Sequence, residues 1–216
     1  MQTQLAINGG TPVVDIVEAP WPKWPIYDER EEKALLDVLH SEKWWYVEGT
    51  NGKLLEQEFA AYQNAKYGVA CTNGSAALEI CLRALGIGCG DEVIVPPYTF
   101  IATASAVLAS GATPIFADIE GDTLNIDPLE IEKAITSRTK AIIPVHMAGR
   151  PADMDAIIAL KEKHNLFVIE DAAQAHGAEW NGTKVGALGD MGTFSLQASK
   201  NLNAGEGGLI ISNNEE

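Results

Sequence analysis

One lysine and one aspartate in this sequence stand where their side chains could do chemistry together. Lys200 follows the stretch Thr193-Phe194-Ser195-Leu196-Gln197-Ala198-Ser199 and precedes a glycine-rich turn. Asp171 ends another strand-like run, Leu166-Phe167-Val168-Ile169-Glu170. A lysine amine can form an imine with an aldehyde, and a carboxylate can keep the nitrogen of a heteroaromatic ring protonated. Most lysines are solvated surface charges, so the pairing with Asp171 is what points to a reactive amine.

Pyridoxal phosphate is the cofactor that needs both groups. Its aldehyde reacts with an amine, and its ring accepts electrons while the ring nitrogen is protonated. A carboxylate at the end of a buried strand also needs a cationic partner or strong hydrogen bonds to stay ionised. The alternative for Asp171 is a cap for the turn that follows it.

A possible phosphate site lies earlier in the chain, at Asn73-Gly74-Ser75-Ala76. This segment follows a strand-like run and opens a predicted helix, so its free backbone amides and the Ser75 hydroxyl could bind an anion. Gly74 would let a phosphate approach closely. A plain helix cap explains the same residues. A nicotinamide-binding fold would need G-x-G-x-x-G after the first strand, and that motif is not there.

Composition limits the class of protein. The 216 residues carry a net charge of −15, with 46% hydrophobic and 21% charged residues. This is ordinary for a globular chain and argues against non-specific nucleic-acid binding. The three cysteines, Cys71, Cys81 and Cys89, form no C-x-x-C pair. We therefore expect no disulfide framework, no metal site and a cytoplasmic location. No segment reads as a signal peptide or a membrane span.

The order of apolar runs predicts an α/β fold. Residues 1–66 are expected to form an extended arm, which includes Pro20-Trp21-Pro22, and two helices at 28–41 and 52–67. Asp28 should cap the first helix, and Leu55, Phe59 and Tyr62 should be buried in the second. Residues 67–216 should form the large domain, a mostly parallel sheet covered on both faces. Its expected strands are 68–72, 92–96, 113–118, 140–145, 166–170, 192–197 and 208–212, and its expected helices are 75–85, 100–110, 128–136 and 153–163.

Five segments give the chain a family resemblance. It resembles the DegT/DnrJ/EryC1/StrS sugar and cyclitol aminotransferases, which are fold-type I pyridoxal phosphate enzymes. The matching segments follow the family's order and cover nearly the whole chain; they are Thr72-Asn73-Gly74-Ser75-Ala76-Ala77-Leu78, Val95-Pro96-Pro97-Tyr98-Thr99-Phe100, Pro144-Val145-His146-Met147-Ala148-Gly149, residues 170–177 and residues 195–208.

The resemblance implies a three-layer α/β/α sandwich with a seven-stranded sheet whose last strand is antiparallel. It implies that Lys200 holds the cofactor and that Asp171 faces the ring nitrogen. It also assigns the stacking aromatic to Phe100, the phenolic oxygen to Gln174, and the phosphate to Gly74, Ser75 and Ser195. Tyr98 and His176 are weaker candidates, and Trp44, Trp45 and Tyr46 could touch substrate or pack at a subunit contact.

The implied reaction moves an amino group from glutamine or glutamate to a keto-sugar or keto-cyclitol, in a homodimer. Family members continue with a smaller C-terminal domain, so we expect this chain to be the large domain alone. Three alternatives stay open: an aminoshikimate-type (3-amino-5-hydroxybenzoate) synthase, a truncated non-catalytic cofactor-binding module, and a dehydratase. Dehydratases of the family carry histidine in place of the lysine, so Lys200 argues against the last.

Overall fold

The computed structural model describes residues 4–13 and 23–215. By internal contacts the chain divides into two units, Met1–Glu42 and Lys43–Glu216. The second helix of the chain belongs to the second unit, because it packs against the sheet of that unit. Each unit is described by itself below.

The first unit contains a short 3-10 helix, η1 (Ala6–Asn8), and helix α1 (Glu29–Ser41). Asp28 caps α1 as predicted: its side chain accepts from the backbone N–H of Arg30, and Glu31 reaches back to the N–H of Asp28. This reciprocal capping box satisfies two backbone donors at the helix start. The arm residues Pro20, Trp21 and Pro22 lie outside the described residues, and η1 interrupts the predicted extended conformation.

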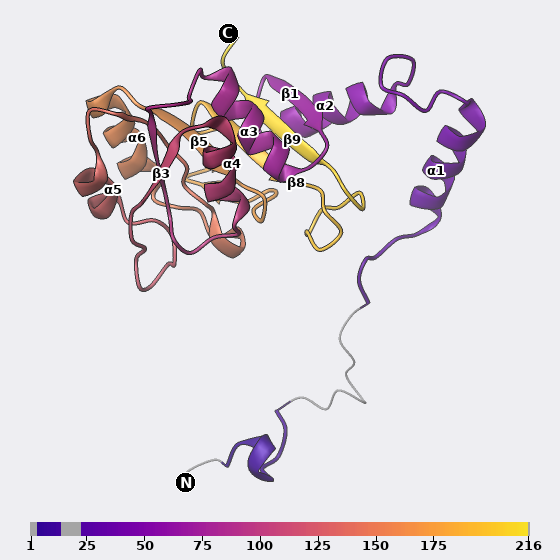
Figure 1. Ribbon diagram of the computed structural model, residues 1–216. Coiled ribbons are helices and arrows are strands. Elements are labelled where there is room, and N and C mark those ends of the chain that lie inside the picture. Colours follow the sequence, from indigo (N-terminus) through magenta and orange to yellow (C-terminus); the bar gives the residue numbers. More distant parts are fainter. Residues whose placement is uncertain (1–3, 14–22, 216) are drawn as a thin grey trace. The chain divides into compact units, whose positions relative to one another are not determined.

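The second unit is built on a seven-stranded sheet with the order β1-β9-β8-β5-β4-β2-β3 (Figure 1). Strands β2, β3, β4, β5 and β8 pair in parallel, whereas β9 runs antiparallel to both β1 and β8. The strands are β1 (Tyr67–Cys71), β2 (Glu92–Val95), β3 (Thr113–Phe116), β4 (Thr139–Ile142), β5 (Phe167–Asp171), β8 (Met191–Ser195) and β9 (Gly208–Ser212). The antiparallel last strand was expected from the family resemblance.

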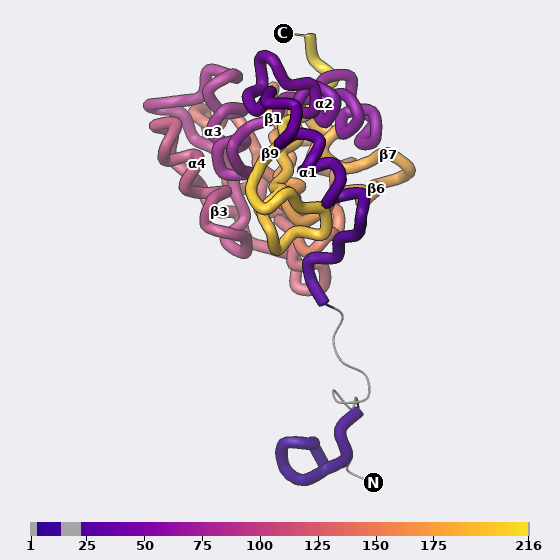
Figure 2. The backbone as a smooth tube through the Cα atoms, turned by 90° about the vertical axis from the view of Figure 1, so that its right-hand side faces the viewer, coloured from indigo at the N-terminus to yellow at the C-terminus, as the bar shows by residue number. Residues whose placement is uncertain are grey.

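Helices cover both faces of this sheet (Figure 2). Helices α3 (Gly74–Ala84) and α4 (Ala102–Ser110) pack on one face. Helices α2 (Asn51–Tyr62), α5 (Pro128–Ala134) and α6 (Met154–His164) pack on the other. A 3-10 turn, η2 (Met147–Gly149), and a small hairpin of β6 (Glu179–Trp180) and β7 (Thr183–Lys184) complete the unit. The structure confirms the predicted α/β/α class.

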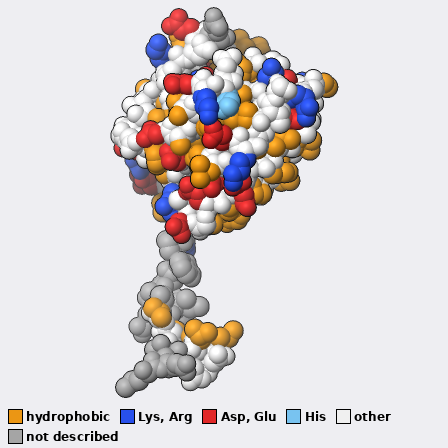
Figure 3. Space-filling view, turned by 90° about the vertical axis from the view of Figure 1, so that its left-hand side faces the viewer, with side chains coloured by type: hydrophobic (Ala, Val, Ile, Leu, Met, Phe, Trp, Pro, Cys, Tyr) orange, Lys and Arg blue, Asp and Glu red, His pale blue; other side chains and the backbone are white. Residues whose placement is uncertain are grey.

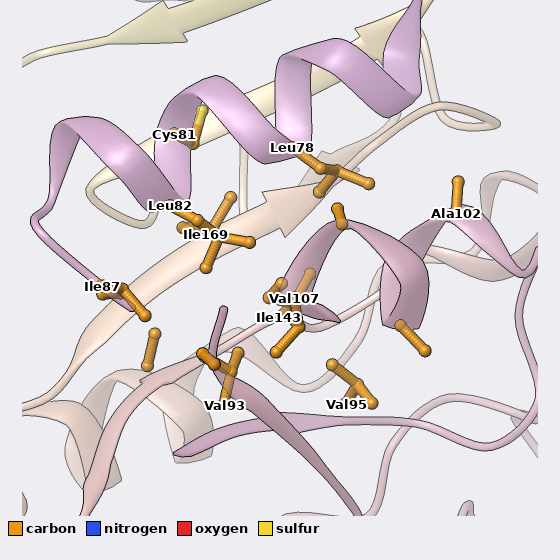
Figure 4. Close-up of a cluster of buried hydrophobic side chains, with 14 of the residues drawn as sticks. Leu78, Cys81, Leu82, Ile87, Val93, Val95, Ala102, Val107, Ile143 and Ile169 are labelled. Carbon is orange, nitrogen blue, oxygen red and sulfur yellow. The ribbon is translucent and has the colours of Figure 1, made fainter. Parts of the chain in front are cut away.

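Alternation along each strand builds the core. In β2, Val93 and Val95 join the cluster under α3 and α4, while Ile94 joins the cluster under α5 and α6. Figure 4 shows the first cluster, which includes Leu78, Cys81 and Leu82 of α3 and Ile169 of β5. Apolar residues on both sides of a strand are what a sheet buried on two faces requires.

The second helix departs from the prediction. It ends at Tyr62, five residues early, because Asn64 takes a left-handed φ of 62°. Only Phe59 of the three predicted core residues is buried. Leu55 and Tyr62 are 36% and 55% exposed, because the helix rests on β1 and β9 along a narrow stripe centred on Phe59 and Ala60.

The surface around α5 and α6 carries acidic and basic side chains side by side (Figure 3). Ion pairs join Lys133 to Glu130 and Lys163 to Glu132. Exposed pairs of this kind contribute little to stability. None of the helices in the described parts of the chain has the length and apolar character that crossing a bilayer requires.

Candidate active site

A pocket of about 510 Å³ opens in the second unit. All seven residues singled out from the sequence line it: Gly74, Ser75, Phe100, Asp171, Gln174, Ser195 and Lys200. In sequence they are spread over more than half of the chain, so the fold itself gathers them.

The gathering follows from the direction of the strands. Asp171 ends β5 and Ser195 ends β8, and these two strands are parallel neighbours. Phe100 follows β2, and Gly74 follows β1. The carboxyl ends of parallel strands meet at one edge of a sheet, where α/β proteins commonly bind ligands. Lys200 lies in the connection from β8 to β9, which folds back through hydrogen bonds from Leu196 N–H to Gly207 O and from Ala198 N–H to Gly205 O.

Asp171 is buried and only partly satisfied by the protein. Its side chain is 6% exposed. Oδ2 accepts a hydrogen bond of 2.8 Å from the Thr103 hydroxyl, and Oδ1 accepts one of 3.2 Å from the Ala173 N–H. Burial raises the pKa of Asp171, and the hydrogen bond from Thr103 opposes that rise most strongly. Each carboxylate oxygen retains capacity for a further donor, so the site can accept a cation or an N–H group from a ligand.

The N-terminus of α3 forms a second wall of the pocket. The Asn73 side chain accepts from the Ala76 N–H at 2.8 Å, and the earlier N–H groups of Gly74 and Ser75 have no intrahelical acceptor. A Cβ on Gly74 would lie 3.0 Å from the Cβ of Ser195, so glycine permits this close approach of helix and strand. Two backbone amides and two serine hydroxyls therefore converge where an anion would be stabilised by the helix end.

The remaining pocket residues differ in how firmly they are held. Phe100 is 66% exposed, which rules out ordinary core packing, and it lines the pocket. Gln174 is anchored through Oε1, which accepts from the Ala148 N–H at 3.0 Å. Lys200 takes part in none of the ion pairs within the described residues.

The weaker sequence candidates lie elsewhere. His176 packs edge-on against Phe59 and close to Phe194, and its Nδ1 meets Asn201 Oδ1 at 2.8 Å. Burial lowers the pKa of His176, which fits the structural role expected for it. Tyr98, Trp44, Trp45 and Tyr46 are exposed and do not line the pocket of Asp171 and Lys200.

Sequence reasoning missed Thr103, which bonds to Asp171 across 68 positions of sequence. Thr103 and Thr99 are four residues apart, a spacing that brings side chains together on a helical turn, but only the fold reveals their common target. Glu206 also lines the pocket and was not singled out.

A buried network behind the pocket was missed as well. Glu170 is fully buried and accepts hydrogen bonds from His146 Nε2 and from the backbone N–H groups of Gly186, Leu188 and Gly189, at 2.7–2.9 Å. The Ala152 N–H donates to His146 Nδ1, so the His146 proton lies on Nε2 and is donated to Glu170. The backbone N–H of His146 in turn donates to the Asp171 carbonyl oxygen.

The sequence of this chain is similar to those of known proteins. The chain is 50% identical over 85% of its length to the "Pleiotropic regulatory protein" of Geobacillus stearothermophilus. It is 44% identical over its full length to the L-glutamine:2-deoxy-scyllo-inosose aminotransferase of Streptomyces paromomycinus. It spans about half the length of these curated relatives, 49% and 51%.

Solved structures agree with the fold. The aminotransferase from Psychrobacter cryohalolentis superimposes with a TM-score of 0.89 at 46% identity, covering 91% of this chain and 50% of that one. A 3-amino-5-hydroxybenzoic acid synthase superimposes with a TM-score of 0.89 at 43% identity, covering 91% of this chain and 51% of that one. Residues 25–216 match the model of a single family. This chain therefore belongs to the DegT/DnrJ/EryC1/StrS aminotransferase family.

Proposed function

We propose that this chain is the cofactor-binding part of a pyridoxal phosphate-dependent aminotransferase. In this proposal an amino group passes from glutamine or glutamate to a keto-sugar or keto-cyclitol. The observation that carries it is one pocket that combines the Lys200 amine, the buried Asp171 carboxylate and the α3 N-terminus. Family membership and relatives that are named as cyclitol aminotransferases support it.

The pocket residues fit pyridoxal phosphate. Asp171 is a buried carboxylate with unused acceptor capacity, which suits a protonated ring nitrogen. Gly74, Ser75 and Ser195 offer amides and hydroxyls to a phosphate. Phe100 would contact the ring face, and Gln174 would lie by the phenolic oxygen. When bound, the cofactor supplies an electron sink that stabilises negative charge at the α-carbon of an amino acid.

Lys200 and Asp171 would bind the cofactor and control its protons. Lys200 Nζ would hold the cofactor covalently, and once released it would move a proton away from the α-carbon of the amino donor. Asp171 would keep the ring nitrogen protonated through its negative charge. Donor and acceptor would use the same pocket in turn, so the kinetics should be ping-pong.

The first experiment tests attachment of the cofactor. The chain is incubated with pyridoxal phosphate and treated with borohydride, and peptides are mapped by mass spectrometry. The proposal requires a covalent adduct on Lys200. An adduct on another lysine, or none, would contradict the site assignment.

The second experiment tests the reaction and separates the alternatives. Glutamine-dependent amination is measured with 2-deoxy-scyllo-inosose, scyllo-inosose and a keto-sugar nucleotide as acceptors. An aminoshikimate-type synthase, suggested by the resemblance to 3-amino-5-hydroxybenzoic acid synthase, would instead aromatise an aminoshikimate substrate. A non-catalytic module would bind the cofactor and aminate none of the acceptors.

The proposal also covers the domain bounds, the oligomeric state and the location of the protein. Residues 67–216 would form the cofactor-binding large domain, and the complete enzyme would be a cytoplasmic homodimer. The three cysteines are free in the structure, which is compatible with a reducing compartment. Size-exclusion chromatography with light scattering would measure the oligomeric state.

A further inference from the structure

Two threonine hydroxyls form a chain that ends on Asp171. Thr103 lies in the first turn of α4 and is fully buried. Its Oγ1 lies 2.8 Å from Asp171 Oδ2 and 2.8 Å from Thr99 Oγ1. Thr99 itself lines the pocket. The Thr103 hydroxyl is therefore buried and bonded to a carboxylate that lines the pocket, so it does more than fill space in the helix.

The direction of this chain follows from the chemistry of Asp171. An ionised carboxylate only accepts hydrogen bonds, so Thr103 must donate its proton to Oδ2. The Thr103 oxygen is then free to accept, and Thr99 is the donor that faces it. The order is therefore Thr99 to Thr103 to Asp171, and each donor strengthens the next.

The two threonine hydroxyls oppose the effect that burial has on the pKa of Asp171. Desolvation raises the pKa of Asp171, while the bonds from Thr103 and from the Ala173 N–H lower it. Two charged or titratable side chains act on it through space, His146 and Lys200, and Glu206 lines the same pocket. Thr103 is the only side-chain hydroxyl that bonds to Asp171 among the described residues.

We propose that Thr103, supported by Thr99, is a positioning residue that fixes the orientation of the Asp171 carboxylate and keeps it charged for the ring nitrogen of the cofactor. The cofactor half of this inference rests on the proposed function. The carboxylate half does not, because it concerns the protein without any ligand.

The test compares variants that differ by one hydroxyl. Thr103→Val keeps the shape of the side chain and removes the donor, whereas Thr103→Ser keeps the donor. Thr99→Val removes only the supporting donor. Ser105→Ala is the matched control, because Ser105 lies on the same helix with its hydroxyl near the Ala102 carbonyl and is not among the residues that line the pocket.

The first measurement uses the chain without cofactor. The titration of Asp171 is followed by carboxyl carbon NMR, with Asp171→Asn identifying the resonance. Thr103→Val should raise the pKa of Asp171 above its wild-type value, Thr99→Val should raise it less, and Thr103→Ser and Ser105→Ala should leave it close to wild type. A Thr103→Val variant that titrates like wild type would overturn the inference.

The second measurement is the dissociation constant for pyridoxal phosphate. Loss of a hydrogen bond to a charged group should weaken binding about tenfold in Thr103→Val, with recovery in Thr103→Ser. Equal weakening in both variants would mean a packing role and would overturn the inference. If wild type fails to bind, the proposed function fails, while the titration still decides the role of Thr103. If Thr103→Val does not fold, an unchanged Asp171 titration in Thr99→Val is enough to overturn the hydroxyl chain.

Discussion

Two neighbouring carboxylates at the end of β5 have opposite surroundings. Glu170 and Asp171 are both buried, yet their side chains point to opposite faces of the sheet. Glu170 accepts from four protein donors behind the pocket. Asp171 accepts from two, and its side chain lines the pocket. A buried carboxylate whose hydrogen bonds are all made within the protein stabilises the fold, whereas one with unused acceptor capacity can bind a ligand.

Two adjacent residues therefore have different roles: Glu170 contributes to folding stability, and Asp171 contributes to ligand binding. Breaking the Glu170 side should cost folding free energy and leave the chemistry of the pocket in place. Breaking the pocket side should abolish or slow the chemistry and leave the fold intact. The following substitutions test that separation, beginning with the largest effect.

Lys200→Ala should abolish covalent attachment of pyridoxal phosphate, because no other amine in the pocket can replace it. Mass spectrometry after borohydride reduction measures the loss, and urea unfolding should give a free energy within about 0.5 kcal/mol of wild type, as for a surface substitution. Lys184→Ala and Lys140→Ala are the controls and should label normally. A persisting adduct in Lys200→Ala would identify another anchor.

Asp171→Asn should slow the glutamine half-reaction more than a hundredfold, which is about 2.7 kcal/mol. An amide carries no negative charge, so it cannot keep the ring nitrogen protonated. Formation of the keto acid from glutamine is measured in a single turnover. A rate within tenfold of wild type would remove the role assigned to Asp171 and with it the contrast to Glu170.

Glu170→Gln should destabilise the fold by about 3 kcal/mol, because the new amide group would face buried N–H donors that need an acceptor. The loss is read from the midpoint of urea unfolding at constant slope. Thr103→Ser is a suitable companion, since it changes a buried polar group on the pocket side and should cost much less. Equal losses in the two variants would end the distinction between the two sides of β5.

The smallest expected effect is a pH dependence of stability. Because the pKa of Asp171 is raised above its ordinary value of 3.8, the folded chain holds that proton more tightly than the unfolded chain. Its stability should therefore fall, relative to Asp171→Asn, as pH rises from about 3.8 through the raised pKa. Unfolding free energies of both proteins without cofactor, measured from pH 3 to pH 8, test this. A difference that stays constant over that range would mean that Asp171 has no raised pKa.

The layout of strands and helices in this protein could be predicted from its sequence. Apolar runs placed the strands of the main sheet and most of the helices within a few residues of their observed bounds, since an inner strand such as β2 is buried on both faces and a helix such as α3 on one. Local motifs pointed to Lys200, Asp171, Gly74 and Ser75, and the family resemblance added Phe100, Gln174 and Ser195. All seven residues line one pocket. The errors fell where packing decides: Leu55 and Tyr62 have helical spacing but remain exposed.

The tertiary structure alone decided how the carboxylates differ. The sequence Glu170-Asp171 does not show which side chain faces a ligand. Adjacent residues of a strand point to opposite faces of the sheet, and the elements packed on each face decide which one carries the pocket. The bond from Thr103 to Asp171 and the amides of Gly186, Leu188 and Gly189 around Glu170 join segments that are far apart in sequence. Such contacts depend on the order and direction of the strands, and the apolar pattern within each segment does not predict them.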